Sequence, residues 1–178
     1  LATDQMTVTV TDDENPTVAA TADITANTSD DGLGDCTVAV SITDATFSDN
    51  CAGSSLSWAM TGAVNTTGTG QITSYTFPIG TTTITYTATD AANNLATDQI
   101  AGTVADEEKP IVPAAGHIIE KTSDEVLGDC TVAVSIPDAT LSDNCAGSSL
   151  SQAMTGEVNT TRTGHNTSYR FPIGNTTI

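Results

Sequence analysis

The strongest constraint on this chain is an internal repeat. The stretch LGDCTVAVSITDAT at residues 33–46 returns as LGDCTVAVSIPDAT at residues 127–140. The cysteines repeat with it, because Cys36 recurs as Cys130 and Cys51 as Cys145, and both offsets equal 94 (130 − 36 and 145 − 51). A period of this length is too long for a unit of a helical solenoid and suits one small β domain. The chain therefore contains about two copies of one module.

Short strands are expected throughout each copy. Apolar and polar residues alternate in several runs, which is the pattern of a strand with one buried face. Thr and Val favour such strands, and 6 prolines and 14 glycines interrupt any long helical run. About seven short strands separated by turns predict an all-β fold, with tandem immunoglobulin-like β-sandwich domains. The side chains expected to point into the core of the first copy are Val38, Val40, Ile42, Leu56, Met60, Tyr75, Phe77, Ile79, Ile84 and Tyr86.

One long run resembles a known family. Residues 77–110 read FPIGTTTITYTATDAANNLATDQIAGTVADEEKP and are preceded by GDC and SDNC segments, a combination that resembles the hyalin repeat (HYR) module. The resemblance covers nearly the whole chain. It implies extracellular, immunoglobulin-like modules used for adhesion and surface architecture, without catalysis. The chain departs from the family pattern in lacking a second cysteine pair and in having Asn94 where a glycine is usual.

Acidic turns that end in proline divide the chain. The segments DENP at residues 13–16 and EEKP at residues 107–110 have the composition of linkers between modules. Residues 1–12 match residues 95–106, so they are expected to be the closing strand of a preceding or neighbouring repeat. The two HYR-like repeats are then residues 13–106 and residues 107–178, the second truncated before its last strand.

The two ends of the chain complement each other. Ile178 is equivalent to Ile84, and the closing strand that follows Ile84 in the first repeat has its counterpart in residues 1–12. A sandwich without its last strand has an open core and an unpaired edge, which favours the addition of a strand. We expect residues 1–12 to fill that place in a neighbouring module, head to tail, either along one long polypeptide or between separate subunits. The side chains that would enter the core are Met6, Val8 and Val10.

The strong negative charge limits the partners. Acidic residues outnumber basic ones 22 to 4, for a formal net charge of −18, so nucleic acid and anionic membrane surfaces are not expected as partners. No apolar stretch approaches the roughly 20 residues that span a bilayer.

The acidity is explained either by a solvated surface that keeps a secreted protein soluble or by carboxylates that hold calcium. The candidate calcium ligands lie in the two linkers and the TDAANN turn, and they are Asp12, Asp13, Glu14, Asp90, Asn93, Asn94, Asp106, Glu107 and Glu108, with Asp49 and Asn50 as further candidates.

The cysteines predict disulfides. Each repeat has two cysteines and no CxxC pair, so zinc is not expected. An even number at a repeated spacing predicts Cys36–Cys51 and Cys130–Cys145 and an oxidising compartment, and free buried thiols are the alternative. One difficulty is geometric. A six-residue strand that starts at Cys36 ends about 20 Å away, whereas the Cα atoms of a disulfide lie within about 7 Å, so the chain would have to double back before Cys51.

Sequons for N-linked glycans form a second surface signal. Such sequons also arise by chance in a Thr-rich chain, and only Asn65 and Asn159 occupy equivalent positions in the two repeats. The full set of candidates is Asn27, Asn65, Asn159, Asn166 and Asn175.

No catalytic constellation stands out. Neither His117 nor His165 belongs to the shared module, and no Ser or Cys nucleophile is paired with either at a recognisable motif, so an enzyme is not expected. Near-identical copies favour a structural extracellular protein, the building block of a filament, stalk or adhesin. The alternative is a carbohydrate- or protein-binding module of a secreted or cell-surface protein, in which an exposed Trp58 would stack on sugars. The alternation of Trp58 with Leu56 and Met60 favours a core position instead.

Overall fold

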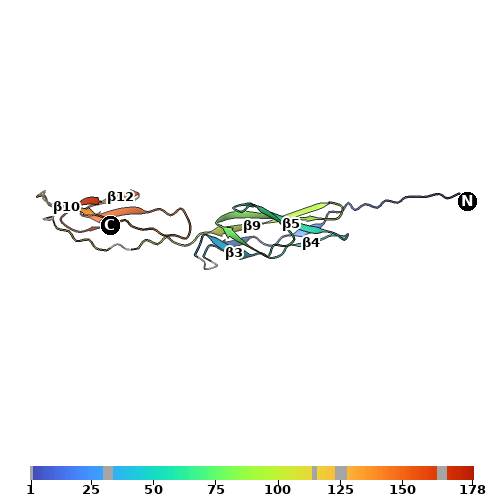
Figure 1. The fold of residues 1–178 in the computed structure, drawn as a ribbon, viewed down its shortest axis with the longest axis horizontal. Helices are drawn as coiled ribbons and strands as arrows, with labels where there is room; N and C mark the ends of the chain where they lie inside the picture. Colours follow the sequence, from blue (N-terminus) through green and yellow to red (C-terminus); the bar gives the residue numbers. More distant parts are fainter. Residues whose placement is uncertain (1, 30–33, 114–115, 123–127, 164–167) are drawn as a thin grey trace. The chain divides into compact units, whose positions relative to one another are not determined.

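The structure, a computed structural model, describes residues 2–29, 34–113, 116–122, 128–163 and 168–178 (Figure 1). All of the secondary-structure elements that are named in these ranges are β-strands. This confirms the predicted all-β sandwich of immunoglobulin type. The chain divides into two compact units, Leu1–Glu107 and Glu108–Ile178. No helix in the described ranges is long and apolar enough to cross a membrane.

A five-stranded sheet forms one layer of the first unit. Its strand order is β2-β9-β8-β5-β6. The pairs β9–β8, β8–β5 and β5–β6 are antiparallel, whereas β2 runs parallel to β9. The strand β9 is therefore enclosed between β2 and β8. The strands are β2 (Ile24–Asn27), β5 (Ser55–Gly62), β6 (Thr66–Thr69), β8 (Gly80–Thr89) and β9 (Leu95–Ala105).

Two strand pairs form the opposite layer. The strand β1 (Thr17–Ala19) pairs with β4 (Thr46–Ser48), and β3 (Thr37–Ser41) pairs with β7 (Ser74–Pro78). The consecutive strands β1 and β2 thus belong to different sheets. The strands β4 and β6 are short and pair through their backbones, without the long apolar alternation that marks a strand in the sequence.

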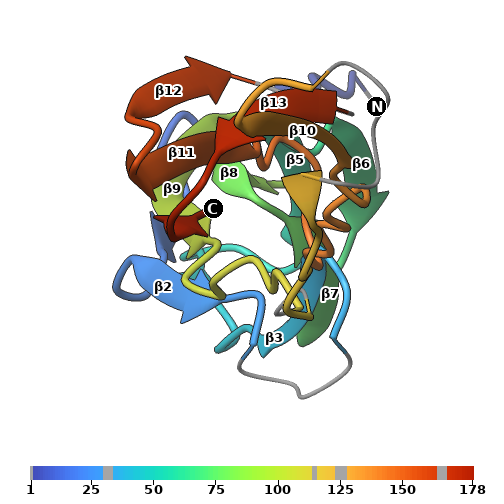
Figure 2. The same cartoon turned by 90° about the vertical axis from the view of Figure 1, so that its left-hand side faces the viewer.

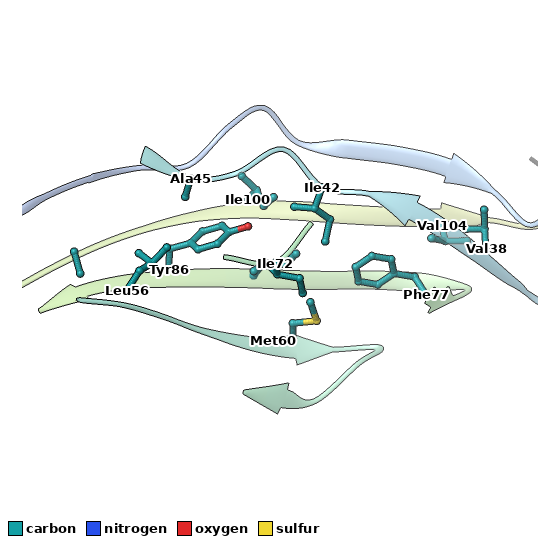
Figure 3. Packing of buried hydrophobic residues seen from close by; sticks show 12 residues of the cluster. Val38, Ile42, Ala45, Leu56, Met60, Ile72, Phe77, Tyr86, Ile100 and Val104 are labelled. Atoms are coloured by element: carbon teal, nitrogen blue, oxygen red, sulfur yellow. The ribbon is translucent and has the colours of Figure 1, made fainter. Parts of the chain in front are cut away.

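The core of the first unit lies between these layers (Figure 3). Seven of the ten side chains expected there are buried, and Val40 and Tyr75 pack against them while partly exposed. Ile79 is the exception at 41% exposure. It lies between the end of β7 and the start of β8, where Gly80 has a φ of 117°, so the chain changes direction and the alternation that places Phe77 inward does not continue.

Trp58 also packs against this core while remaining partly exposed. It is paired across β5 and β6 with Gly68, and a Cβ added to Gly68 would lie 2.2 Å from Cζ2 of the Trp58 ring. The ring therefore occupies the space that any other residue at position 68 would need. The equivalent pair in the second repeat is Gln152 and Arg162, so both members of the pair differ together.

We expect Gly68→Ala to destabilise the first unit by about 1–3 kcal/mol, because the new methyl group forces the Trp58 ring out of its position. Urea unfolding followed by tryptophan fluorescence would measure the change. In a Trp58→Gln background the same substitution should cost little, since the ring is gone, and urea unfolding followed by circular dichroism would then measure it. An equal cost of Gly68→Ala in both backgrounds would show that the ring contact is unimportant.

Carboxylates attach the incoming chain to β9. Asp98 accepts hydrogen bonds from the backbone N–H groups of Ala20 and Gln99, both at 2.9 Å, and Asp23 accepts one from Ala101 N–H at 2.8 Å. The bonds from Ala20 and Gln99 lower the pKa of Asp98 against an opposing effect of burial. The ionised form of Asp98 therefore stabilises the folded state.

This shift predicts a pH dependence. A carboxyl whose pKa is lowered on folding adds stability above its unfolded pKa of about 3.9, and that contribution is lost as the pH falls through the lower folded value. Asp98→Asn keeps an acceptor for Ala20 but does not titrate, so the variant should lose less stability than the native chain between pH 5 and acid. Urea midpoints measured across that range would check this, with the exposed Asp13→Asn as the control. The same acid dependence in both variants would contradict it.

The second unit repeats part of this arrangement (Figure 2). The strand β10 (Thr131–Ser135) pairs with β13 (Ser168–Pro172), as β3 pairs with β7. The strand β11 (Ser151–Gly156) pairs with β12 (Thr160–Thr163) and β14 (Thr176–Thr177), as β5 pairs with β6 and β8. Its core is smaller, with Ile136, Met154 and Val158 buried and Tyr169 and Phe171 packed against them.

The predicted disulfide pairs are wrong. Cys51 and Cys130 are free thiols, so neither Cys36–Cys51 nor Cys130–Cys145 forms. In the first unit the reason is distance. Cys36 precedes β3, whose first residue pairs with Pro78 beside the start of β8, while Cys51 lies near Asp90 at the far end of β8. The ten residues of β8 span about 33 Å, far beyond the roughly 7 Å that a disulfide allows.

Candidate metal centre

Three carboxylates meet at one end of the first unit. Asp12 lies in the segment before β1, Asp49 in the loop between β4 and β5, and Asp90 in the turn between β8 and β9. An oxygen of each lies within 4.8 Å of an oxygen of the other two. The sandwich topology brings them together, because the chain enters at the end where β8 turns into β9 and where β5 begins.

Asp90 is fixed by the turn that it starts. Its Oδ1 accepts a hydrogen bond from Asn94 N–H at 2.7 Å, and its Oδ2 accepts one from Asn94 Nδ2 at 2.8 Å. Asn93 has a φ of 72°, the left-handed conformation that closes this turn. Burial by itself would raise the pKa of Asp90, but the hydrogen bonds from Asn94, Ala92 and Asn93 together hold that pKa below its usual value. Asp90 is therefore ionised at neutral pH although it is only 5% exposed.

The other two carboxylates are each held on one side. Asp12 Oδ1 accepts a bond from Glu14 N–H at 3.3 Å, and Asp49 Oδ2 accepts one from Cys51 N–H at 3.1 Å. The remaining oxygens, Asp12 Oδ2 and Asp49 Oδ1, are fully buried, and no hydrogen bond satisfies either within the described part of the chain. Burying such an oxygen without a partner is costly. The two unsatisfied oxygens mark a place where a cation would be stabilising.

Further contacts tie the entry segment to this end. Asn94 Nδ2 donates to the backbone oxygen of Asp12 at 3.4 Å, so Asn94 links the entry segment to the Asp90 turn. Asn50 donates a hydrogen bond to the Glu14 carboxylate. The pKa of the Cys51 thiol is raised, chiefly by its interaction with the Asp12 carboxylate. Loss of water and the negative charges of the cluster add to this effect. Cys51 is therefore a protonated neighbour of the carboxylates rather than a thiolate.

The predicted ligands are only partly brought together. Asp12, Asp90 and Asn94 meet, and Asp49 joins them. Asp49 was only a further candidate, because its position depends on the path of the chain after β3. The pairing of β4 with β1 determines that path. The other predicted ligands do not belong to the cluster. Asp13, Asn93, Glu107 and Glu108 are exposed, Glu14 contacts Asn50, and Asp106 accepts a hydrogen bond from Thr28 at 3.4 Å.

The two equivalent sequons have a structural explanation. Asn65 Nδ2 donates to Gly62 O at 2.9 Å, and Asn159 Nδ2 donates to Gly156 O at 2.8 Å. Both asparagines are exposed and close the same turn in their respective repeats. Asn27 ends β2 and Asn175 is exposed, while Asn166 lies outside the described residues.

The expected strand-exchange side chains are exposed. Met6, Val8 and Val10 have exposures of 86%, 72% and 90%, and residues 2–16 form no strand. Their equivalents in β9, Ile100, Gly102 and Val104, are all buried.

The HYR domain model matches residues 11–104. This range runs from the entry segment through most of β9, so it covers the carboxylate cluster and both layers of the sandwich. Searches of the curated proteins and of the solved structures found no match. HYR domains occur in extracellular and cell-surface proteins. The chain belongs to the HYR domain family.

Proposed function

We propose that this protein is a structural, non-enzymatic repeat protein located outside the cell, in which HYR modules are joined head to tail into a filament, stalk or adhesin. The 94-residue repeat and the family membership support this function. The observation that carries it is an apolar cleft in the second unit, at the place that β9 occupies in the first.

In the first unit, β9 completes both the sheet and the core. It pairs with β8 along ten residues of each strand and with β2 along four. Its side chains Ile100 and Val104 are 2% and 5% exposed and belong to the main apolar cluster. The strand is therefore a central part of the module rather than a removable edge.

In the second unit, the neighbours of that strand surround a cleft of about 900 Å³. Residues 118–121 are equivalent to β2 but form no strand, as expected if β2 depends on pairing with β9. Ile118, Glu120 and Lys121 line the cleft together with Thr176 and Thr177 of β14, the equivalent of β8. The core residues Val132, Ile136 and Phe171 also line it. The cleft thus has the two flanks and the apolar lining that a closing strand requires.

The occupant that we propose is a strand with the sequence of residues 1–12. Its first five residues, LATDQ, are identical to residues 95–99 at the start of β9. Met6 and Val10 would take the buried positions of Ile100 and Val104. Val8 would take that of Gly102, where an added Cβ would lie 3.7 Å from the nearest neighbouring atom, an ordinary contact. The strand comes from a neighbouring module, either along one polypeptide or from a separate copy.

A chain in which residues 85–105 are repeated after Ile178 would test this proposal. We expect the added strand to fill the cleft, so that amide hydrogen exchange in β10, β11 and β13 slows and the melting temperature of the second unit rises. The matched control carries aspartate at the added counterparts of Ile100 and Val104, and it should leave exchange unchanged. Unchanged exchange with the unmodified extension would contradict the proposal.

The carbohydrate-binding alternative finds less support. It relied on an exposed Trp58, and the ring instead packs against the core and over Gly68.

A further inference from the structure

We propose that Asp12, Asp49 and Asp90 bind a calcium ion at the end of the first unit where the chain enters. Two independent observations carry this proposal. The three carboxylates converge within 4.8 Å of one another, and two buried oxygens, Asp12 Oδ2 and Asp49 Oδ1, have no hydrogen-bond partner in the described part of the chain. The inference does not depend on how modules join, because all three residues belong to one unit.

No side chain of the first unit can neutralise these carboxylates. Fourteen of the 22 acidic residues precede residue 108, whereas all four basic residues, Lys109, Lys121, Arg162 and Arg170, follow it. The Cys51 thiol interacts with the Asp12 carboxylate, but a thiol is only a weak donor and carries no positive charge. Buried charges in proteins are normally paired or bound to a metal. The unit has no basic residue that could pair with them, whereas a bound cation would compensate the charge.

The geometry and the donor set favour calcium. Calcium binds oxygens at about 2.3–2.6 Å, so two ligands of one ion lie at most about 5 Å apart. The 4.8 Å limit on the three carboxylate oxygens fits within this range. The protein donors are carboxylates on three separate loops, which suits the irregular coordination of calcium better than the strict octahedron of magnesium. Zinc would favour thiolate or imidazole ligands, whereas the donors that converge here are three carboxylates.

Binding would join three segments that are distant in the sequence. Asp12 lies in the segment that leads into β1, whereas Asp49 and Asp90 lie on loops of the sandwich itself. In the structure, the described contacts of that segment with the two loops include the bonds from Asn94 to Asp12 O and from Asn50 to Glu14. A calcium ion would therefore immobilise the entry segment against the module.

The test is a calcium titration of the full chain, with Asp49→Asn compared against Asp13→Asn. Both variants lose one negative charge, but Asp13 is exposed and lies outside the cluster. Asp49→Asn keeps an oxygen that can accept from Cys51 N–H, so this variant is expected to fold. Extracellular calcium sites commonly have a Kd of about 0.1–1 mM. Calcium at 10 mM should therefore raise the melting temperature of the native chain and of Asp13→Asn by at least about 5 °C.

In Asp49→Asn this rise should fall to about half or less, and isothermal titration should show an affinity for calcium at least about tenfold weaker than in Asp13→Asn. Addition of calcium should slow the amide exchange of residues 11–16 in the native chain but not in Asp49→Asn. Three results would overturn the proposal: no thermal shift at 10 mM calcium, an equal shift in both variants, or an equal shift with sodium chloride at matched ionic strength.

Discussion

Replacing Phe77 with alanine should lower the free energy of unfolding of the first unit by about 3–5 kcal/mol. Phe77 lies on β7 and is only 2% exposed, and its ring centroid is 5.1 Å from that of Tyr75. Truncation removes the side chain from the middle of a closely packed layer and leaves a cavity that two facing sheets cannot collapse to fill. The loss is large for a module with few aromatic residues. Urea unfolding of the variant, followed by circular dichroism, would measure it.

The matched control is Ile79→Ala, two residues further along the chain. Strand alternation alone predicts that both residues point inward, but Ile79 is 41% exposed. We expect its truncation to cost less than about 1 kcal/mol. If Ile79→Ala proved as costly as Phe77→Ala, the change of direction between β7 and β8 would be incorrect.

The substitution Ile100→Asp should unfold the first unit. Ile100 lies at the centre of β9 and is 2% exposed, so the variant would place a carboxylate without a cationic partner in the apolar core. Penalties of this kind exceed about 4 kcal/mol, against a total stability of roughly 5–15 kcal/mol for a domain. Loss of the near-ultraviolet circular dichroism of the first unit at 25 °C would show the effect.

The equivalent substitution in residues 1–12, the segment that matches the sequence of β9, is Met6→Asp. Met6 is 86% exposed, so the first unit should keep its melting temperature. A matched loss of stability in both variants would show that residues 1–12 contribute to the fold of the first unit. An unchanged first unit in Ile100→Asp would show that β9 is not part of its core.

The sequence predicted the layers of this fold more successfully than its edges. Alternating apolar residues such as Val38, Met60 and Tyr86 report burial directly, and all three are in the core. The strands β4 and β6 are rich in Thr and Ser and owe their conformation to pairing with β1 and β5, which only the folded chain supplies. The prediction that Ile79 is buried was wrong, because the alternation of apolar residues cannot show where a chain passes from one sheet to the next.

The candidate site was predictable to the extent that it follows from chain topology. The entry linker and the turn after β8 meet at one end of an immunoglobulin-like module, which brought Asp12, Asp90 and Asn94 together. The predicted disulfide pairs were wrong because of the same topology. The equal spacing of the cysteines in the two repeats does not show at which end of the sandwich each cysteine lies. The pairing of Trp58 with Gly68 was hidden as well, since a glycine in a Thr-rich stretch gives no sign of the ring that covers it.

The most direct test of the proposed assembly is sedimentation velocity of the chain over a wide range of concentration. In the proposed assembly, residues 1–12 of one copy would bind in the cleft of another, a head-to-tail contact that does not close on itself. The oligomers should therefore form an open series that grows with concentration. A variant with aspartate at Met6, Val8 and Val10 should sediment as a monomer throughout. A native chain that stays monomeric at every concentration, with residues 2–12 unprotected from exchange and the second unit as protected as the first, would contradict the account.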